Sequence, residues 1–275
     1  MTLLHLPRGR FRGLLTSLFA MLVVSPLTQA ATLMPNVWYS SHSAGTSEHG
    51  GVRFVTNKGA GVRHVLTYFK PVSLTLVGDS VTVSLTFAAE FASDPDSNGS
   101  NFGFALYNSD GSRISADNLG PGTSTMPAFT DYRGYRVNMR TKPANASQVP
   151  LVLRTRAVSH NALGNTNTAH PILKEEIQGG GSAGSNLVSG YPYNVQYTIT
   201  RVSDEALDIS FTVRGRGLAN YSYTWTVDAI SIGFTTTFDT FAITLASPKI
   251  FDSLMLTDVR VSSGAFIPES SAAGR

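Results

Sequence analysis

The chain has 275 residues, a formal net charge of +3, 42% hydrophobic residues, 14% charged residues and no cysteine. Without cysteine there can be no disulfide framework, no thiolate metal site and no cysteine nucleophile. The sparse charge and the high apolar content also exclude a disordered, highly charged tail protein. The length suits one large all-β domain or two smaller domains.

The first 30 residues have the composition of a targeting segment. They contain Arg8, Arg10 and Arg12 and no acidic residue, followed by a mostly apolar run from Leu14 to Val24 and a short end of small residues. This order predicts a secretory signal peptide over residues 1–30. The run is shorter than the roughly 20 residues that a membrane span needs. We therefore predict a secreted or cell-envelope protein whose mature chain has no transmembrane span.

The net charge belongs to this segment. Removing its three arginines from the 21 basic residues leaves 18, which equals the 18 acidic residues. The mature chain is therefore formally neutral, and neutrality disfavours nucleic acid as a partner.

Period-two alternation dominates the rest of the chain. Between Ser80 and Phe91, apolar residues alternate with Ser, Thr and other small or polar residues, the pattern of a half-buried strand. Similar runs cover residues 52–56, 62–69, 101–107, 135–140, 151–158, 193–201, 206–213, 221–227, 238–245 and 253–261. So many short strands separated by turn residues predict an all-β fold, an antiparallel two-sheet β-sandwich of the jelly-roll type. We assign this domain to residues 31–263 and a flexible tail to residues 264–275.

Several of these stretches carry a family resemblance. Residues 51–56, 66–69, 78–83, 101–107 and 251–261 look like those of exported bacterial proteins with a concanavalin A-like, or laminin G-like, jelly roll. The resemblance implies two facing sheets, one of them concave, in a superfamily where that face often holds glycans.

The tail carries a second, partial resemblance. Residues 266–273 are similar to the opening of a PEP-CTERM sorting signal, although Ser270 stands where a second proline is usual. The hydrophobic span and the terminal arginine cluster of such a signal are missing from this chain.

Two of the runs show an arginine-rich face, because polar side chains occupy every second position. If the two strands pair, four guanidinium groups converge on one patch of sheet, and guanidinium groups bind carboxylate or sulfate in two places. The hypothesis is a binding face for an acidic polysaccharide. The alternative is that the arginines point to solvent and pair with scattered acidic residues. The residues concerned are Arg136, Asn138, Arg140, Arg154 and Arg156.

Aromatic side chains supply a second candidate site. Tyr191 and Tyr193 lie two residues apart, on one face of a strand, and aromatic rings stack well on sugars. Tyr223 and Trp225 have the same spacing, and we assign them to the core. Trp38–Tyr39 suits either role.

His160 is the candidate catalytic residue if the protein is an enzyme. It follows the second arginine run, where a base beside arginines suits β-elimination in uronic-acid polymers, with Asn138 helping to stabilise the intermediate. The alternative is a plain loop histidine. A glycoside hydrolase is less favoured than a lyase, since Glu175–Glu176 would face opposite sides of a strand and Glu90 stands alone.

Asp94, Asp96 and Asn98 have the spacing of the first half of a calcium loop, without the glutamate that completes it. A structural calcium ion and an ordinary polar turn both fit this sequence. No other cofactor is required by any motif.

These observations predict a secreted carbohydrate-binding or cell-envelope recognition protein whose partner is a polysaccharide or a cell-surface glycan. A polysaccharide lyase and a structural extracellular protein are the alternatives.

Overall fold

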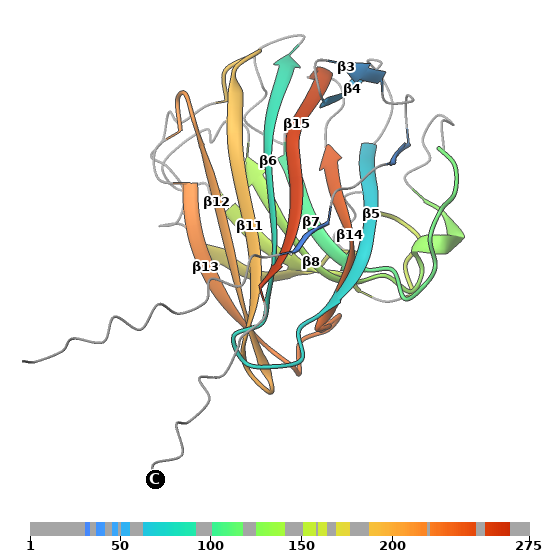
Figure 1. The fold of residues 1–275 in the computed structure, drawn as a ribbon, viewed down its shortest axis with the longest axis vertical. Coiled ribbons are helices and arrows are strands. Elements are labelled where there is room, and N and C mark those ends of the chain that lie inside the picture. Colours follow the sequence, from blue (N-terminus) through green and yellow to red (C-terminus); the bar gives the residue numbers. More distant parts are fainter. Residues whose placement is uncertain are drawn as a thin grey trace, which may run out of the picture.

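The structure is a computed structural model of the chain, and it is almost entirely β (Figure 1). The residues that it describes are 31–33, 37–41, 46–48, 51–55, 63–91, 101–117, 125–140, 151–157, 159–163, 169–176, 187–218, 221–245 and 251–264. The predicted signal peptide, the calcium candidates Asp94, Asp96 and Asn98, and the PEP-CTERM-like residues lie outside this part of the chain. No helix in the described ranges is long and apolar enough to cross a membrane.

The strands, in chain order, are β1 (Ala31–Leu33), β2 (Trp38–Ser40), β3 (Thr46–Glu48), β4 (Gly51–Val55), β5 (Arg63–Ser73), β6 (Ser80–Phe91), β7 (Asn101–Asn108), β8 (Arg133–Arg140), β9 (Leu151–Thr155), β10 (Ile172–Glu176), β11 (Pro192–Ser203), β12 (Ala206–Gly215), β13 (Tyr221–Asp228), β14 (Thr237–Leu245) and β15 (Phe251–Gly264). One 3-10 turn, η1, covers Pro127–Phe129.

The strands form two antiparallel sheets. The first has eight strands in the order β13-β12-β11-β6-β15-β4-β3, with β1 also paired to β15. The second has seven strands in the order β10-β9-β8-β7-β14-β5-β2. Strands distant in sequence are neighbours in both sheets, as in a jelly roll. The prediction of an all-β, antiparallel two-sheet sandwich is confirmed.

Alternation in the sequence becomes alternation of burial in the sheet. Along β6 the side chains from Ser80 to Ala89 are alternately half-buried and buried, and β12 repeats the pattern. The apolar members of both strands face the second sheet. Phe104 of the seven-stranded sheet meets Phe211 of the eight-stranded sheet with ring centroids 5.3 Å apart. The hydroxyl of Tyr197 also donates across the interface to the carbonyl of Tyr135, at 3.2 Å. The main core therefore lies between the sheets.

A second, smaller apolar cluster lies on the outer face of the seven-stranded sheet. Leu66, Ala105, Tyr107 and Ala242 point outward from β5, β7 and β14, on the side opposite the main core. Chain segments at residues 109–117, 125–132 and 159–163 lie over this face. They contribute the buried side chains Ile114, Phe129, Tyr132 and Leu163. A sheet face that would otherwise meet solvent is thus largely covered.

Candidate functional site

The arginine face predicted from the sequence exists as a face of the sheet. In the pairing of β8 with β9, Arg136 lies opposite Arg154, and Arg156 follows two residues later on the same side. This side is the outer face of the seven-stranded sheet, because Tyr135, Val137 and Met139 belong to the main core. The prediction of strand pairing and of a shared face is therefore correct.

Most of the polar side chains on this face are buried and do not meet solvent. Arg136 and Arg156 are fully buried, Asn138 is 6% exposed, and only Arg140 and Arg154 are half-buried. The guanidinium of Arg156 donates to the carbonyls of Ala162, Phe129 and His160, all in the covering segments. Arg136 donates to the carbonyl of Leu163 at 3.4 Å.

The buried arginines hold the covering segments on the sheet. The half-buried Arg154 makes a similar contact outside these segments, since its Nη1 donates to the carbonyl of His170, just before β10, at 2.7 Å. Burial lowers the pKa of Arg136 to about 10, and the nearby charges of Arg154 and Arg156 also act to lower it. Guanidinium groups that are enclosed by protein cannot touch a polysaccharide. The hypothesis that Arg136 and Arg156 bind an acidic glycan directly is therefore corrected to a structural role.

The two tyrosines of the second candidate site differ in burial. Tyr193 is 1% exposed, stacks on Phe87 at 5.3 Å and donates to the carbonyl of Arg216, so it is a core residue and not a ligand platform. Tyr191 is 39% exposed, and the guanidinium of Arg216 lies 4.3 Å from its ring centroid.

His160 is half-buried and belongs to the covering segment at residues 159–163. Its main-chain carbonyl accepts a hydrogen bond from Arg156, so the backbone at His160 helps to fix the buried arginine.

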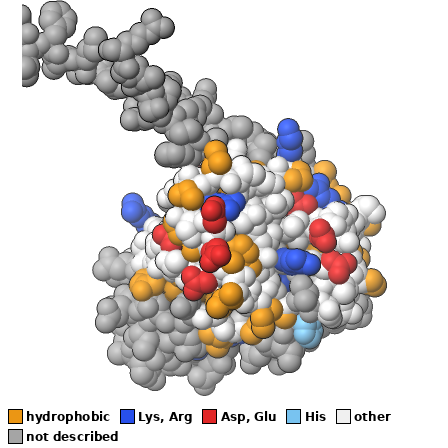
Figure 2. Space-filling view, turned by 90° about the horizontal axis from the view of Figure 1, so that it is seen from below, with side chains coloured by type: hydrophobic (Ala, Val, Ile, Leu, Met, Phe, Trp, Pro, Cys, Tyr) orange, Lys and Arg blue, Asp and Glu red, His pale blue; other side chains and the backbone are white. Residues whose placement is uncertain are grey.

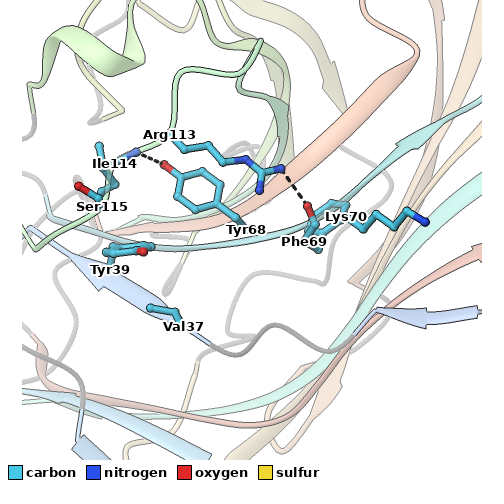
Figure 3. Close-up of a pocket in the computed structure, with 8 residues that line it drawn as sticks. All are labelled: Val37, Tyr39, Tyr68, Phe69, Lys70, Arg113, Ile114 and Ser115. Atoms are coloured by element: carbon cyan, nitrogen blue, oxygen red, sulfur yellow. Dashed lines mark hydrogen bonds between the residues drawn. The ribbon is translucent and has the colours of Figure 1, made fainter.

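An open pocket of about 500 Å³ lies on the same outer face, towards the edge formed by β5 and β2, and Figure 3 shows it in close-up. Its walls come from β2 and the residue before it, from β5 and from the segment after β7. The lining residues are Val37, Tyr39, Tyr68, Phe69, Lys70, Arg113, Ile114 and Ser115.

Two tyrosine rings form one wall of the pocket. Tyr39 on β2 and Tyr68 on β5 have ring centroids 5.7 Å apart and planes inclined by 54°. The pairing of β2 with β5 places them on the outer face, since Tyr39 lies opposite Leu66. Both rings are half-buried, so they present flat apolar area to the pocket.

Tyr68 is held rigidly. Its hydroxyl accepts a hydrogen bond from the amide of Ile114 at 2.9 Å and lies 2.7 Å from the hydroxyl of Tyr132. Burial raises the pKa of Tyr68 above its usual value. The hydroxyl therefore stays protonated at neutral pH, where it is a poor general base.

Two cations stand at the pocket. The guanidinium of Arg113 lies 5.0 Å from the centroid of the Tyr68 ring, and its Nη2 donates to the carbonyl of Phe69 at 3.0 Å (Figure 3). Its Nε and Nη2 also bind Asp239, which leaves Nη1 without a partner among the described residues. Lys70 is exposed, and in Figure 3 its side chain extends away from the two tyrosine rings.

This arrangement combines flat aromatic surface, hydroxyl groups and positive charge, which are the groups that bind sugars. Only Tyr39 was singled out in the sequence, as a residue of undecided role. Tyr68 and Arg113 were missed because nothing local marks them. They meet only when β5 pairs with β2 and the segment after β7 folds back over both.

No protein-family model matches the chain, and no curated protein matches it in sequence. Among solved structures, the seed lectin of Lotus tetragonolobus aligns with a TM-score of 0.49 at 14% identity, covering 84% of this chain and 94% of that one. The lectin UEA-II complexed with galactose gives 0.45 at 14%, covering 86% and 97%. The Emp47p carbohydrate recognition domain gives 0.43 at 12%, covering 87% and 92%.

Likenesses of this strength do not transfer a site or an activity, because one architecture hosts many unrelated functions. The assignment of function therefore rests on the pocket itself.

Proposed function

We propose that this protein binds carbohydrate in the Tyr39–Tyr68 pocket on the outer face of the seven-stranded sheet. The observation that carries the proposal is the pair of half-buried tyrosine rings, 5.7 Å apart, at an open pocket of about 500 Å³. Rings inclined to one another can contact two faces of a sugar, or two neighbouring sugars, and burial of apolar ring area against C–H groups stabilises such contacts. The solved structures with the same architecture include lectins and a carbohydrate recognition domain, but they do not locate the site.

The cations give the proposal a preferred ligand class. Arg113 and Lys70 both line the pocket, and Nη1 of Arg113 has no partner among the described residues. A carboxylate or sulfate on the glycan would form charge-assisted hydrogen bonds with these groups. We therefore propose an acidic polysaccharide, such as a polyuronate, as the ligand. This keeps the ligand class predicted from the sequence but moves the binding residues from Arg136 and Arg156 to Arg113 and Lys70.

Export is part of the proposal. The order of three arginines, an apolar run and small residues in the first 30 positions supports secretion, with the mature protein acting outside the cell or in the envelope.

The lining of the pocket favours binding over lyase chemistry. Among the described residues that line it there is no histidine and no carboxylate, and burial keeps the hydroxyl of Tyr68 protonated. A β-elimination needs a base within hydrogen-bond reach of the proton to be removed. His160 does not line this pocket.

Binding is measured by calorimetry with short oligosaccharides of polygalacturonate and alginate, with uncharged dextran oligosaccharides for comparison. Tyr39→Ala removes one wall and should weaken binding of all ligands at least about tenfold, which corresponds to about 1.4 kcal/mol. Tyr39→Phe keeps the ring and should bind nearly as the natural chain does. Lys70→Gln should weaken only the acidic ligands, and this loss should disappear at high salt.

Tyr191→Ala is the matched control, because Tyr191 is an exposed tyrosine away from the pocket. The pocket is not the binding site if Tyr191→Ala abolishes binding while Tyr39→Ala leaves it intact. The acidic preference is wrong if dextran oligosaccharides bind as tightly as the uronates. Release of unsaturated products during the titration would instead identify a lyase.

A further inference from the structure

Three neighbouring turns at one end of the sandwich expose large apolar side chains. The turns at residues 74–79, 201–206 and 228–234 lie at the lower end of the molecule in Figure 1. Main-chain hydrogen bonds tie them together, from Gly78 to the carbonyl of Arg201 at 2.7 Å and from Ala229 to the carbonyl of Glu205 at 2.7 Å. The exposed apolar residues on these turns are Leu76, Val77, Val202, Ile230 and Ile232.

The exposure of this end is unusual for a soluble domain. Ile230 is 95% exposed and Ile232 is 61% exposed, although isoleucine is among the residues most often buried. Figure 2 looks onto this end and shows hydrophobic side chains on it with acidic and some basic side chains among them. Apolar patches with a polar rim mark interaction surfaces.

The charge of this apolar end is negative. Arg201 forms an ion pair with Asp204 at 3.1 Å, which neutralises one carboxylate. Glu205 and Asp228 remain as exposed carboxylates beside the isoleucines. We call the three turns with these residues the acidic tip.

The opposite end of the same sheet carries the complementary groups. At the far end of β12, Arg214 and Arg216 are exposed, and Arg216 lies over the exposed ring of Tyr191. Neither arginine forms an ion pair with a described residue, whereas Arg53 and Glu90 nearby in β4 and β6 neutralise each other at 2.8 Å. We call Tyr191, Arg214 and Arg216 the basic end. It lies about 30 Å from the acidic tip, at about 3.3 Å per residue along β12.

We propose that the acidic tip docks onto the basic end of a second copy of this chain, so that copies join head to tail. The carboxylates of Glu205 and Asp228 would meet Arg214 and Arg216, while Ile230 and Ile232 would cover the ring of Tyr191. Two acidic tips facing each other would set like charges together, which disfavours a symmetric dimer. A head-to-tail contact does not close on itself unless its rotation forms a ring, so it generates chains of copies.

The glycan pocket lies on the other sheet, so the inference does not depend on the proposed function. If both hold, a chain of copies would present several pockets to one polysaccharide, and multivalent binding would be much tighter than binding by one copy.

Complementary variants test the contact. The tip variant carries Ile230→Ser and Ile232→Ser, and the basic-end variant carries Arg214→Glu and Arg216→Glu. Sedimentation of the natural chain from about 1 µM to about 1 mM should show growing oligomers, and each variant alone should raise the dissociation constant at least about tenfold. A mixture of the two variants should form a one-to-one dimer and nothing larger, because the mixture keeps one intact tip and one intact basic end per pair.

The substituted side chains are exposed, so circular dichroism should show an unchanged fold. Gln196→Ala on β11, exposed and away from both ends, should associate as the natural chain does. A natural chain that stays monomeric throughout the concentration range overturns the proposal. A mixture that stays monomeric while the natural chain associates also overturns it, since the contact would then involve other surfaces. Binding to phosphatidylcholine vesicles that needs Ile230 and Ile232, without self-association, would assign the tip to a membrane instead.

Discussion

Arg113 and Asp239 form an ion pair in which Nη2 lies 2.8 Å from Oδ2, and this pair fixes one wall of the proposed glycan pocket. The Asp239 side chain is almost fully buried in β14, while the Arg113 side chain is 36% exposed. The same carboxylate accepts hydrogen bonds from the amide and the hydroxyl of Ser109, at 2.8 Å and 2.6 Å. One buried carboxylate therefore anchors both ends of the segment from Ser109 to Arg113.

Asp239→Asn should loosen this segment and lower stability. The carboxamide turns one acceptor into a donor, so it cannot accept both from the Ser109 amide at Oδ1 and from Arg113 at Oδ2. We expect a loss of about 2 kcal/mol, mostly from the buried hydrogen bonds, because the partly exposed ion pair contributes little. That loss corresponds to a fall in Tm of about 4–8 °C in a domain of this size.

Thermal unfolding measures this effect, and Asp208→Asn is the control. Asp208 accepts one exposed hydrogen bond from Thr226 on the outer face of the other sheet, so its Tm should change little. Glycan affinity should fall together with stability only in Asp239→Asn, since only that variant disturbs the pocket wall. Equal effects of the two substitutions would contradict the anchoring role of Asp239.

Replacing Arg156 tests the structural role of the buried arginines. Arg156→Met leaves the carbonyls of Ala162, Phe129 and His160 without their donor, and buried unsatisfied carbonyls are costly. We expect a loss of about 3 kcal/mol and faster amide exchange in residues 159–163. Arg156→Lys should restore little of this stability, because a single lysine ammonium cannot reach the three carbonyls to which the planar guanidinium donates.

Hydrogen-exchange mass spectrometry with thermal unfolding gives both readouts. If Arg156 instead bound glycan, its replacement would abolish binding while the exchange of the covering segment stayed normal.

The sequence predicts the sandwich well, because in a half-buried strand the alternation of apolar and polar residues matches the alternation of buried and more exposed positions. The run from Ser80 to Phe91 was predicted with the bounds that β6 has, and Trp225 was correctly assigned to the core. The pairing of β8 with β9 and the common face of Arg136 and Arg154 also followed from alternation.

What failed was the inference that a polar face meets solvent. Alternation shows which side chains share a face but not what covers that face. The sequence suggests that Arg136 and Arg156 are surface residues because arginine rarely lies in a core, and yet both are buried and donate to loop carbonyls of the covering segments. The pocket could not be predicted for a related reason. Tyr39, Tyr68 and Arg113 are brought together by pairing and loop packing over 74 positions of sequence, which no local pattern encodes.

Gly103→Ala should destabilise the seven-stranded sheet. A Cβ on Gly103 would lie 2.3 Å from the hydroxyl oxygen of Thr244 and 2.7 Å from Cδ of Arg136, both too close for real contacts. The Arg136 side chain therefore passes close to Gly103 on the outer face of the sheet, in space that a methyl group would fill. We expect a loss of about 2–3 kcal/mol from overpacking.

Urea unfolding measures this loss, with Gly111→Ala as a comparison. Gly111 has a φ of +81°, and no atom lies within 4 Å of the position that the alanine methyl group would take, so this replacement reports backbone strain alone. That strain should be about 1 kcal/mol. A Gly103→Ala variant as stable as Gly111→Ala would show that Arg136 and Thr244 can move aside.

The protein should lose stability steeply above about pH 10, the usual pKa of tyrosine. Burial raises the pKa of seven of the ten tyrosines, namely Tyr68, Tyr107, Tyr132, Tyr135, Tyr193, Tyr197 and Tyr221. Between the unfolded and the raised folded pKa, the unfolded chain has released protons that the folded chain still holds. Stability is therefore intact below about pH 10 and falls as the pH rises from there. Burial also lowers the pKa values of Arg136 and Arg156, which act in the opposite direction, but these are two groups against seven.

Tyr221→Phe isolates one member of this set. Burial raises the pKa of Tyr221 to about 12, and its buried hydroxyl has no hydrogen-bond partner among the described residues. The variant should be as stable as the natural chain near neutral pH, since no hydrogen bond is lost. Its Tm should fall less steeply between about pH 10 and about pH 11, because the variant lacks one of the tyrosine protons whose release favours the unfolded chain. Ultraviolet titration should show late ionisation of the buried tyrosines, in step with unfolding. Early ionisation of most tyrosines in a chain that stays folded would contradict the assigned burial.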